Sequence, residues 1–318
     1  MLQRVSVCAS CNTESIVKKP SGKFVCAKCG HELEDAYLDK IIEESSALVE
    51  KEDTTALFNI GWCYINGAGV EKNISEGIHY YTTAAESGDM YAQYRLGRCY
   101  EQEIGVSMDN FEAALWFRRA ADQGHAQAQY RLGTCYEDGL GVTRDMTRAV
   151  SYYKQSAEQN NPFGQTALAR CYAHGIGTRK NITQAIHYYK LAAEQDYAPA
   201  AYQLGSIYAD AVGVDENMSE AISWYQKAAD KEYPQALTAL GLCYKDGNGV
   251  EKDEDKAIRY LRLAARKGDG KAQYHLGVCY LNGTCVPFSI SEAMRWFGSA
   301  AENGFDEALN FIKRRFKG

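Results

Sequence analysis

Residues 92–100 read Ala-Gln-Tyr-Arg-Leu-Gly-Arg-Cys-Tyr, and residues 128–136 read Ala-Gln-Tyr-Arg-Leu-Gly-Thr-Cys-Tyr. These two stretches lie 36 residues apart, and related stretches recur at the same interval along the chain. Their small and apolar positions fall at i, i+4, i+7 and i+8, which is one face of a helix. An internal repeat of this length is typical of stacked helical hairpins, so it determines the fold class.

Seven copies of the repeat occur, and each reads as two helices, here named helix A and helix B. Helix A contains a Leu or Ile, then a Cys three residues later in six copies and a Tyr one residue further on in all seven. A Gly-rich loop ends helix A, and an Asn, Asp or Ser begins helix B, where aromatic residues alternate with Ala. We predict an all-α fold and expect two registers in its core. They are Cys63, Cys99, Cys135, Cys171, Cys243 and Cys279, and Tyr64, Tyr100, Tyr136, Tyr172, Tyr208, Tyr244 and Tyr280.

The combined pattern resembles the Sel1-like repeat, a relative of the tetratricopeptide repeat. It consists of Ala-x3-Leu-Gly-x2-Tyr, Gly-x-Gly-Val and Ala-x2-Trp-Tyr-x2-Ala-Ala-x2-Gly, and it covers residues 53–304. The resemblance implies a right-handed α-solenoid of seven 36-residue helix-turn-helix repeats that scaffolds protein complexes and regulates a partner enzyme or signalling pathway. Because a solenoid needs caps, we expect a linker and capping helix in residues 31–52 and a C-terminal capping helix in residues 305–318.

Four cysteines ahead of the array have the spacing of a metal site. Cys8, Cys11, Cys26 and Cys29 form C-x2-C-x14-C-x2-C, which is close to the spacing of zinc sites. Two residues between thiolates let one tight turn present both sulfurs to a tetrahedral Zn²⁺. The segment between the two pairs has the pattern of a β-hairpin. We therefore predict a small β-hairpin zinc ribbon in residues 1–30. It would hold one structural Zn²⁺, because four thiolates leave no open position for catalysis.

The charge distribution separates this ribbon from the array. Residues 1–30 contain five Lys or Arg and one Glu, whereas the whole chain has a formal net charge of −6. An acidic array is a poor match for nucleic acid, because phosphate binding needs a basic surface. The basic ribbon leaves an alternative open, in which it contacts RNA or DNA with Phe24 as a stacking group while the repeats recruit a protein.

A partner-binding surface is predicted from helix-A positions that the repeat pattern does not fix. Positions two residues before and two after the Leu register are expected to point away from helix B, into the concave side of the solenoid. They hold several aromatic residues and Arg, which are enriched at binding hot spots. The candidates are Phe58, Trp62, Tyr94, Arg98, Tyr130, Thr134, Arg170, Tyr202 and Tyr274. The alternative is that the Tyr residues pack between adjacent A helices.

The remaining features argue against an enzyme, a secreted protein or a membrane protein. We find no combination of nucleophile, base and orienting residue. Residues 1–10 lack the basic and apolar regions of a signal peptide, and no apolar run approaches the roughly 18 residues that span a bilayer. One Cys per repeat, acting as a small buried hydrophobe, indicates a reducing compartment. We therefore expect a cytoplasmic protein.

The sequence thus predicts a non-catalytic scaffold or adaptor that binds a partner protein or peptide in the concave groove. Nucleic acid would bind only through the ribbon, and no membrane contact is expected. A weaker alternative is an enzyme regulator with a small-ligand groove. The sequence identifies neither the partner nor the oligomeric state.

Overall fold

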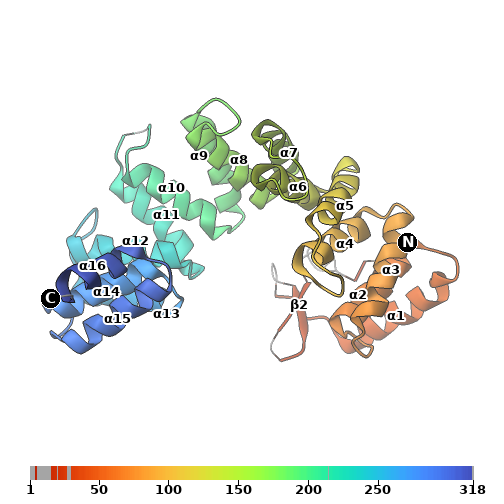
Figure 1. Ribbon diagram of the computed structural model, residues 1–318, viewed down its shortest axis with the longest axis horizontal. Helices are drawn as coiled ribbons and strands as arrows, with labels where there is room; N and C mark the ends of the chain where they lie inside the picture. The colour runs from red at the N-terminus through yellow and green to blue at the C-terminus, as the bar shows by residue number, and fades with distance from the viewer. Residues whose placement is uncertain (1–3, 6–15, 20, 27–29, 214, 317–318) are drawn as a thin grey trace. The chain divides into compact units, whose positions relative to one another are not determined.

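Helical hairpins account for most of the chain (Figure 1). The computed structural model describes residues 4–5, 16–19, 21–26, 30–213 and 215–316. These residues form sixteen α-helices and one two-stranded sheet. The prediction of an all-α repeat fold is confirmed for the array.

Five of the seven A helices begin at a residue whose side chain caps the first turn, α10 and α12 being the exceptions, and most A helices end at a left-handed residue. At the start of α4, for example, the Asp89 carboxylate accepts a hydrogen bond from the Ala92 amide at 2.8 Å, which satisfies one of the amides that the first turn leaves unpaired. At the end of α6, Gly139 has φ 74°, a conformation that costs Gly little. The A helices are α2 (Thr54–Asn66), α4 (Met90–Gln102), α6 (Ala126–Asp138), α8 (Pro162–His174), α10 (Ala198–Ala209), α12 (Pro234–Asp246) and α14 (Gly270–Asn282).

The B helices begin at the predicted Asn, Asp or Ser. The Asp145 carboxylate, for example, accepts hydrogen bonds from the amides of Thr147 and Arg148, both at 3.0 Å. The B helices are α3 (Ile74–Glu86), α5 (Asn110–Asp122), α7 (Met146–Glu158), α9 (Ile182–Glu194), α11 (Met218–Asp230), α13 (Glu254–Arg266) and α15 (Ile290–Glu302).

The two predicted core registers differ in burial. The six repeat cysteines are all buried, as expected. The Tyr register is half-buried except for Tyr136, so the expectation of a fully buried register is wrong. Several of these rings stack on a helix-B ring sixteen residues later, for example Tyr64 on Tyr80 with centroids 5.9 Å apart. One face of such a ring is covered, and the rest stays accessible.

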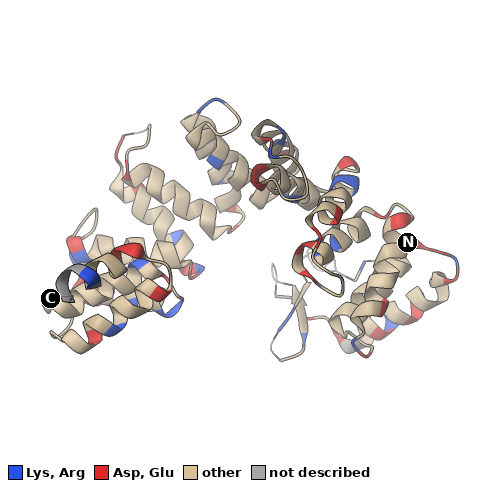
Figure 2. Cartoon of the chain, viewed as in Figure 1, with Lys and Arg blue, Asp and Glu red and all other residues tan. Residues whose placement is uncertain are grey.

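The helices form two compact units, residues 1–164 and 165–318, and the boundary falls within α8. In the first unit, each A helix packs against the B helix that follows it, and α3 and α5 also pack against the next A helix. The second unit repeats this arrangement from α9 to α15. Figure 2 shows Lys and Arg interspersed with Asp and Glu in both units.

Additional elements flank the repeats. Strands β1 (Ile16–Lys18) and β2 (Phe24–Cys26) pair antiparallel, with Val17 opposite Val25. Helix α1 (Asp35–Val49) packs against α2, and α16 (Asp306–Phe316) packs against α15. Ala308 of α16 is fully buried on the repeat register.

Candidate functional site

Three of the predicted groove residues lie in the core. Phe58, Trp62 and Tyr94 are 0%, 3% and 5% exposed. The prediction that these side chains point into an open groove is therefore wrong. The remaining candidates, described below, are half-buried.

The position two residues before the Leu register connects one repeat to the next. The Phe58 ring stacks on Tyr81 of the following B helix at 5.5 Å and meets Tyr91 of the next A helix edge-on at 6.4 Å. Tyr94 packs against Phe117, the counterpart of Tyr81, at 6.0 Å and against His125, the residue that caps the next A helix, at 4.7 Å. These rings fill the space between consecutive hairpins, which explains their burial.

The same contact recurs in the later repeats, so the packing alternative describes the Tyr candidates better. Tyr130 packs against Tyr153 and Phe163, Tyr202 against Tyr225 and Tyr233, and Tyr274 against Phe297 and Phe305, with ring centroids 5.3–6.0 Å apart. Where the register holds Thr238 instead, its hydroxyl donates a hydrogen bond to Asp269 at 2.9 Å. A polar contact there replaces the aromatic one.

The polar candidates on α4 and α6 lie in or beside a partly accessible charge network. Arg98 Nε lies 3.1 Å from the Glu101 carboxylate, and Arg131 of α6 lies 3.6 Å from the same carboxylate. Arg98 also donates to the Tyr94 hydroxyl at 3.2 Å. The side chains of Arg98, Glu101 and Arg131 are 26%, 25% and 31% exposed. Two cations thus share one anion beside the half-buried Thr134.

Arg170 of α8 is half-buried as well. Its positive charge acts on Tyr189 and opposes the rise of that phenol's pKa, but burial dominates and raises the pKa to about 12. Tyr189 is therefore neutral at physiological pH.

The N-terminal hairpin covers part of the first repeat. The Phe24 ring lies 5.2 Å from the Trp62 ring, and both side chains are buried. The Lys18 ammonium donates a hydrogen bond to the Asn66 carbonyl at the end of α2, at 3.0 Å. The burial of Trp62 therefore comes from the chain itself, which the repeat pattern alone does not reveal.

Residues 4–5 make a second contact with the same repeats. Arg4 forms an ion pair with both oxygens of Asp89, at 2.5 and 3.2 Å. The Val5 amide donates a hydrogen bond to the Asn59 side-chain oxygen at 2.9 Å. Sequence reasoning missed this site, although Asn occurs at this repeat position in the first copy alone.

Of the four predicted zinc ligands, only Cys26 belongs to the described residues; Cys8, Cys11 and Cys29 lie outside them. Cys26 ends β2 and is buried. Its carbonyl accepts a hydrogen bond from the Gly30 amide at 2.9 Å, and its amide donates to the His31 carbonyl at 2.7 Å. Gly30 has φ 75°. Cys26 thus places one buried thiol at the end of the hairpin, and the zinc site stays a prediction, because its other three ligands lie outside the described residues.

The repeat cysteines have the electrostatics of core residues. Burial raises the thiol pKa of Cys63 and Cys135 to about 12 and that of Cys99 to about 11. A thiol must ionise to act as a nucleophile or a metal ligand. These side chains therefore serve packing, as the sequence indicates.

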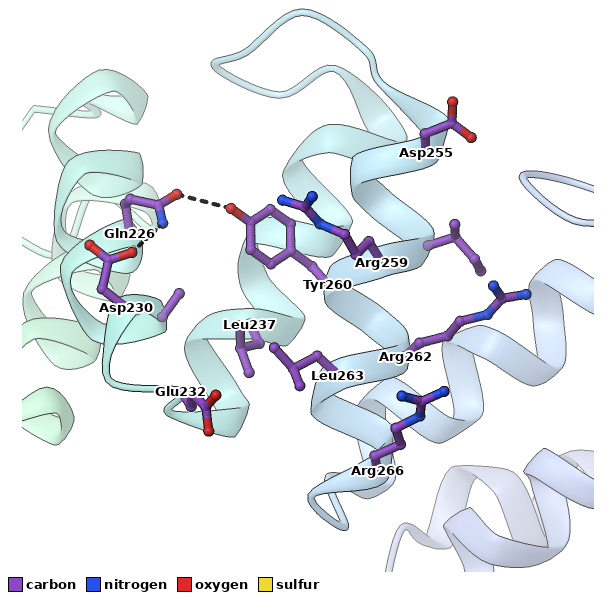
Figure 3. A pocket seen from close by; sticks show the side chains of 12 residues that line it. Gln226, Asp230, Glu232, Leu237, Asp255, Arg259, Tyr260, Arg262, Leu263 and Arg266 are labelled. Carbon is purple, nitrogen blue, oxygen red and sulfur yellow. Dashed lines mark hydrogen bonds between the residues drawn. The ribbon is translucent and has the colours of Figure 1, made fainter.

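A surface hollow of about 790 Å³ lies between α11 and α13 (Figure 3). The Tyr260 hydroxyl points across it and donates to Gln226 at 3.2 Å, and Gln226 in turn donates to Asp230 at 2.7 Å. The lining carries Arg259 and Arg266 as well as Asp230 and Glu232. The hollow thus carries both signs of charge, and several of its polar groups are hydrogen-bonded to one another. It does not have the single sign of charge that would favour a charged ligand.

A smaller hollow of about 540 Å³ lies around Tyr136 in the first unit. The Tyr136 hydroxyl accepts hydrogen bonds from Arg118 at 2.8 Å and Arg148 at 3.3 Å. Arg148 also pairs with Asp145 at 3.4 Å. Both arginines therefore already have partners within the array.

Comparison with known proteins agrees with this architecture. The Sel1 repeat pattern matches seven consecutive segments, residues 54–89, 91–125, 126–161, 162–197, 198–233, 234–269 and 270–305. A stack of such hairpins defines an α-helical repeat protein, and the chain belongs to the Sel1 repeat family. Sel1 repeat proteins generally mediate protein–protein interactions, and their fold is generally a non-catalytic scaffold. No curated protein matches the chain significantly.

Solved structures with 28–30% sequence identity share the fold. A protective antigen present in uropathogenic Escherichia coli strains, which displays an SLR fold, is 28% identical with a TM-score of 0.74. The match covers 86% of this chain and 58% of that protein, so this chain spans little more than half of it. A Sel1 repeat protein from Oxalobacter formigenes is 30% identical with a TM-score of 0.69, and the match covers 89% of this chain and 82% of that one. Among the described residues, no helix is long and apolar enough to span a membrane.

Proposed function

We propose that the chain is a non-catalytic scaffold that binds a partner protein or peptide on its helix-A face in the cytoplasm. The helix-A face is the side of the A helices that faces away from the B helices. The ribbon is a structural element with one Zn²⁺ bound by Cys8, Cys11, Cys26 and Cys29.

One observation carries this proposal: Arg98, Glu101 and Arg131 form a partly exposed charge network on α4 and α6. Two guanidinium groups share one carboxylate, so the network has an excess positive charge. Arginine recognises carboxylates with strong, directional hydrogen bonds. The surface therefore suits an acidic segment of a partner protein, with Tyr130 and Thr134 beside it.

The test compares partner binding by the full chain and by Arg98→Gln/Arg131→Gln. The partner is first captured by crosslinking and identified, and its affinity is then measured with purified proteins. We expect the double variant to bind about thirtyfold more weakly, because loss of an Arg hot spot costs about 2 kcal/mol. Lys154→Gln on α7 is the control, since Lys154 is 58% exposed on a B helix. Equal affinities of the double variant and the unchanged protein would exclude this surface.

The structure gives less support to the nucleic-acid alternative. Phe24, the expected stacking group, is 5% exposed and packs on Trp62. Two of the basic side chains also have partners, because Lys18 is bound to the Asn66 carbonyl and Lys23 pairs with Glu32 at 3.2 Å. The groups on which that alternative depends are thus engaged within the protein.

A further inference from the structure

The contacts of residues 4–5 have the chemistry of a bound peptide. The Arg4 guanidinium meets both oxygens of the Asp89 carboxylate, and its carbon lies 4.3 Å from the centroid of the Tyr91 ring and 5.1 Å from that of Phe58. A cation held between an ion pair and aromatic faces is a strong recognition mode for arginine. The Asp89 side chain is 2% exposed and that of Arg4 18%. A carboxylate buried this deeply needs a positive partner.

The neighbouring residue is recognised as well. Val5 is fully buried, and its amide donates to the Asn59 side chain at 2.9 Å. Asn59 is itself fully buried, and its amide nitrogen lies 3.5 Å from the Ser45 hydroxyl of α1. The site therefore binds three successive groups: an arginine side chain, the next backbone amide and an aliphatic side chain.

Two residues of this site depart from the repeat pattern. The contact with residues 4–5 is therefore not explained by the requirements of the repeat fold. The later copies have Arg, Arg, Ala, Gln, Ala and His at the position of Asn59. The position of Tyr91 holds Thr in the first copy and Gln, Phe, Pro, Gln and Lys in the later ones. Asp89 serves α4 as its N-cap, but capping alone does not require the Arg4 contact. Asn59 and Tyr91 are not needed for the repeat, and both contact residues 4–5.

We propose that Asp89, Tyr91, Phe58 and Asn59 form a peptide-binding site for an extended segment with arginine followed by an aliphatic residue, and that residues 4–5 occupy it as an intramolecular ligand. A partner segment of the same chemistry binds by displacing residues 4–5. The proposal shares with the proposed function the idea that the helix-A face binds peptides. It concerns different residues from Arg98 and Arg131, so the two tests fail independently.

The first experiment is trypsin cleavage of the full chain after Arg4, followed by mass spectrometry of the intact protein. The scissile bond contains the Val5 amide that is bound to Asn59, so docking protects it. Asp89→Asn removes the charge but keeps a residue that caps helices well. We expect this variant to be cleaved after Arg4 at least tenfold faster. Asp269→Asn is the matched control, because Asp269 caps α14 at the same repeat position.

Equal cleavage rates in the unchanged protein and Asp89→Asn would overturn the proposal. So would protection that grows with protein concentration, because the ligand would then come from a second copy of the chain.

The second experiment supplies the ligand in trans as a fluorescent peptide with the sequence of residues 1–7. We expect it to bind full-length Arg4→Ala at least tenfold more tightly than the unchanged protein, in which the tethered segment competes at high effective concentration. Binding should fall at least tenfold in Arg4→Ala/Asp89→Asn and for a peptide with Ala in place of its Arg. A peptide that fails to bind Arg4→Ala, or that binds all three proteins equally, would show that the site is no peptide receptor.

Discussion

The ring of Tyr153 on α7 lies directly against Gly133 on α6. A Cβ atom placed on Gly133 would be 2.5 Å from the nearest ring carbon, and Tyr153 is fully buried. The Gly register of the A helices therefore has a steric cause, since large helix-B side chains occupy the space that a Cβ would need. We predict that Gly133→Ala lowers the free energy of unfolding by about 1–3 kcal/mol, the usual cost of overpacking.

The control is Gly298→Ala in α15, where a Cβ would meet no atom within 4 Å. Replacing an unhindered helical Gly by Ala stabilises by up to about 1 kcal/mol. Urea denaturation followed by circular dichroism should therefore show a lower denaturation midpoint for Gly133→Ala and a higher one for Gly298→Ala. Equal shifts would contradict the steric explanation.

A second prediction concerns Phe58, whose role differs from the one expected from the sequence. Because its ring is fully buried between Tyr81 and Tyr91, Phe58→Ala should cost about 3–5 kcal/mol of stability. Partner binding at the Arg98–Arg131 network, which Phe58 does not touch, should then be lost only where folding is lost. Arg98→Gln, which changes a partly exposed side chain, should leave the denaturation midpoint nearly unchanged. A Phe58→Ala protein of normal stability would contradict the packing role.

The 36-residue period predicts the helices and the buried cysteines because equivalent residues of every copy pack against equivalent neighbours. Periodicity does not show which helix-A side chains remain accessible. The Phe58 position looked free because a hairpin considered alone leaves it uncovered, whereas the next hairpin covers it. Trp62 is buried by Phe24, which belongs to no repeat.

One signal in the sequence could have revealed a further contact. Gln side chains of the A helices accept hydrogen bonds from an amide thirty residues later at 2.7–2.9 Å, in the pairs Gln93–Gln123, Gln129–Gln159, Gln165–Gln195 and Gln273–Asn303. Where the first member is Ala201 or Leu237, the second is Lys231 or Lys267. The two positions change together because a buried amide needs a partner. Residues 4–5 carry no comparable pattern, since they occur once.

A third prediction concerns pH and His275 of α14. Burial, assisted by the charges of Lys245 and Lys271 and opposed by those of Asp246 and Asp269, lowers the pKa of this imidazole from 6.5 to about 4. Above pH 6.5 the group is neutral in both states, so its contribution to stability is complete. Between pH 6.5 and about 4 the imidazole is protonated in the unfolded chain but stays neutral in the folded one. The free energy of unfolding therefore falls by at most about 3 kcal/mol.

Urea denaturation at pH 7.5 and pH 4.5 tests this sign. The loss of stability between the two pH values should be smaller in His275→Gln than in the unchanged protein. His187→Gln on α9 is the control, because His187 is exposed. An unchanged pH dependence in His275→Gln would show that another group causes the acid sensitivity.

A fourth prediction concerns thiol reactivity. Burial raises the pKa of half-buried Cys285 to about 11 and that of fully buried Cys63 to about 12, from 9.0. Since the thiolate is the reacting form, Cys285 should react at pH 8 about a hundredfold more slowly in the folded protein than in urea. Cys63 should react only through unfolding. Timed alkylation with peptide mapping measures each site, and labelling of Cys63 ahead of Cys285 would contradict the packing described here.

The same shifts give a stability prediction at alkaline pH. Folded thiols with a raised pKa contribute full stability below pH 9, and this contribution is lost as the pH rises toward 12 because the unfolded chain ionises first. Cys135→Ala should cost about 1 kcal/mol at pH 7, as a small core truncation does. Its stability should then fall less steeply above pH 9 than that of the unchanged protein. Parallel pH profiles for the two proteins would argue against buried thiols as the cause.

The last prediction concerns zinc and its link to the array. If Cys8, Cys11, Cys26 and Cys29 bind one Zn²⁺, elemental analysis of reduced protein should give one equivalent, and Cys26→Ser should retain less than half. Zinc would hold the hairpin whose Phe24 ring covers Trp62 at 5.2 Å. Metal removal should therefore expose Trp62 and shift its fluorescence to longer wavelength, and Trp62→Phe should abolish the shift. Less than half an equivalent of zinc in the unchanged protein would exclude the site, and metal loss without a fluorescence change would separate it from the Phe24 contact.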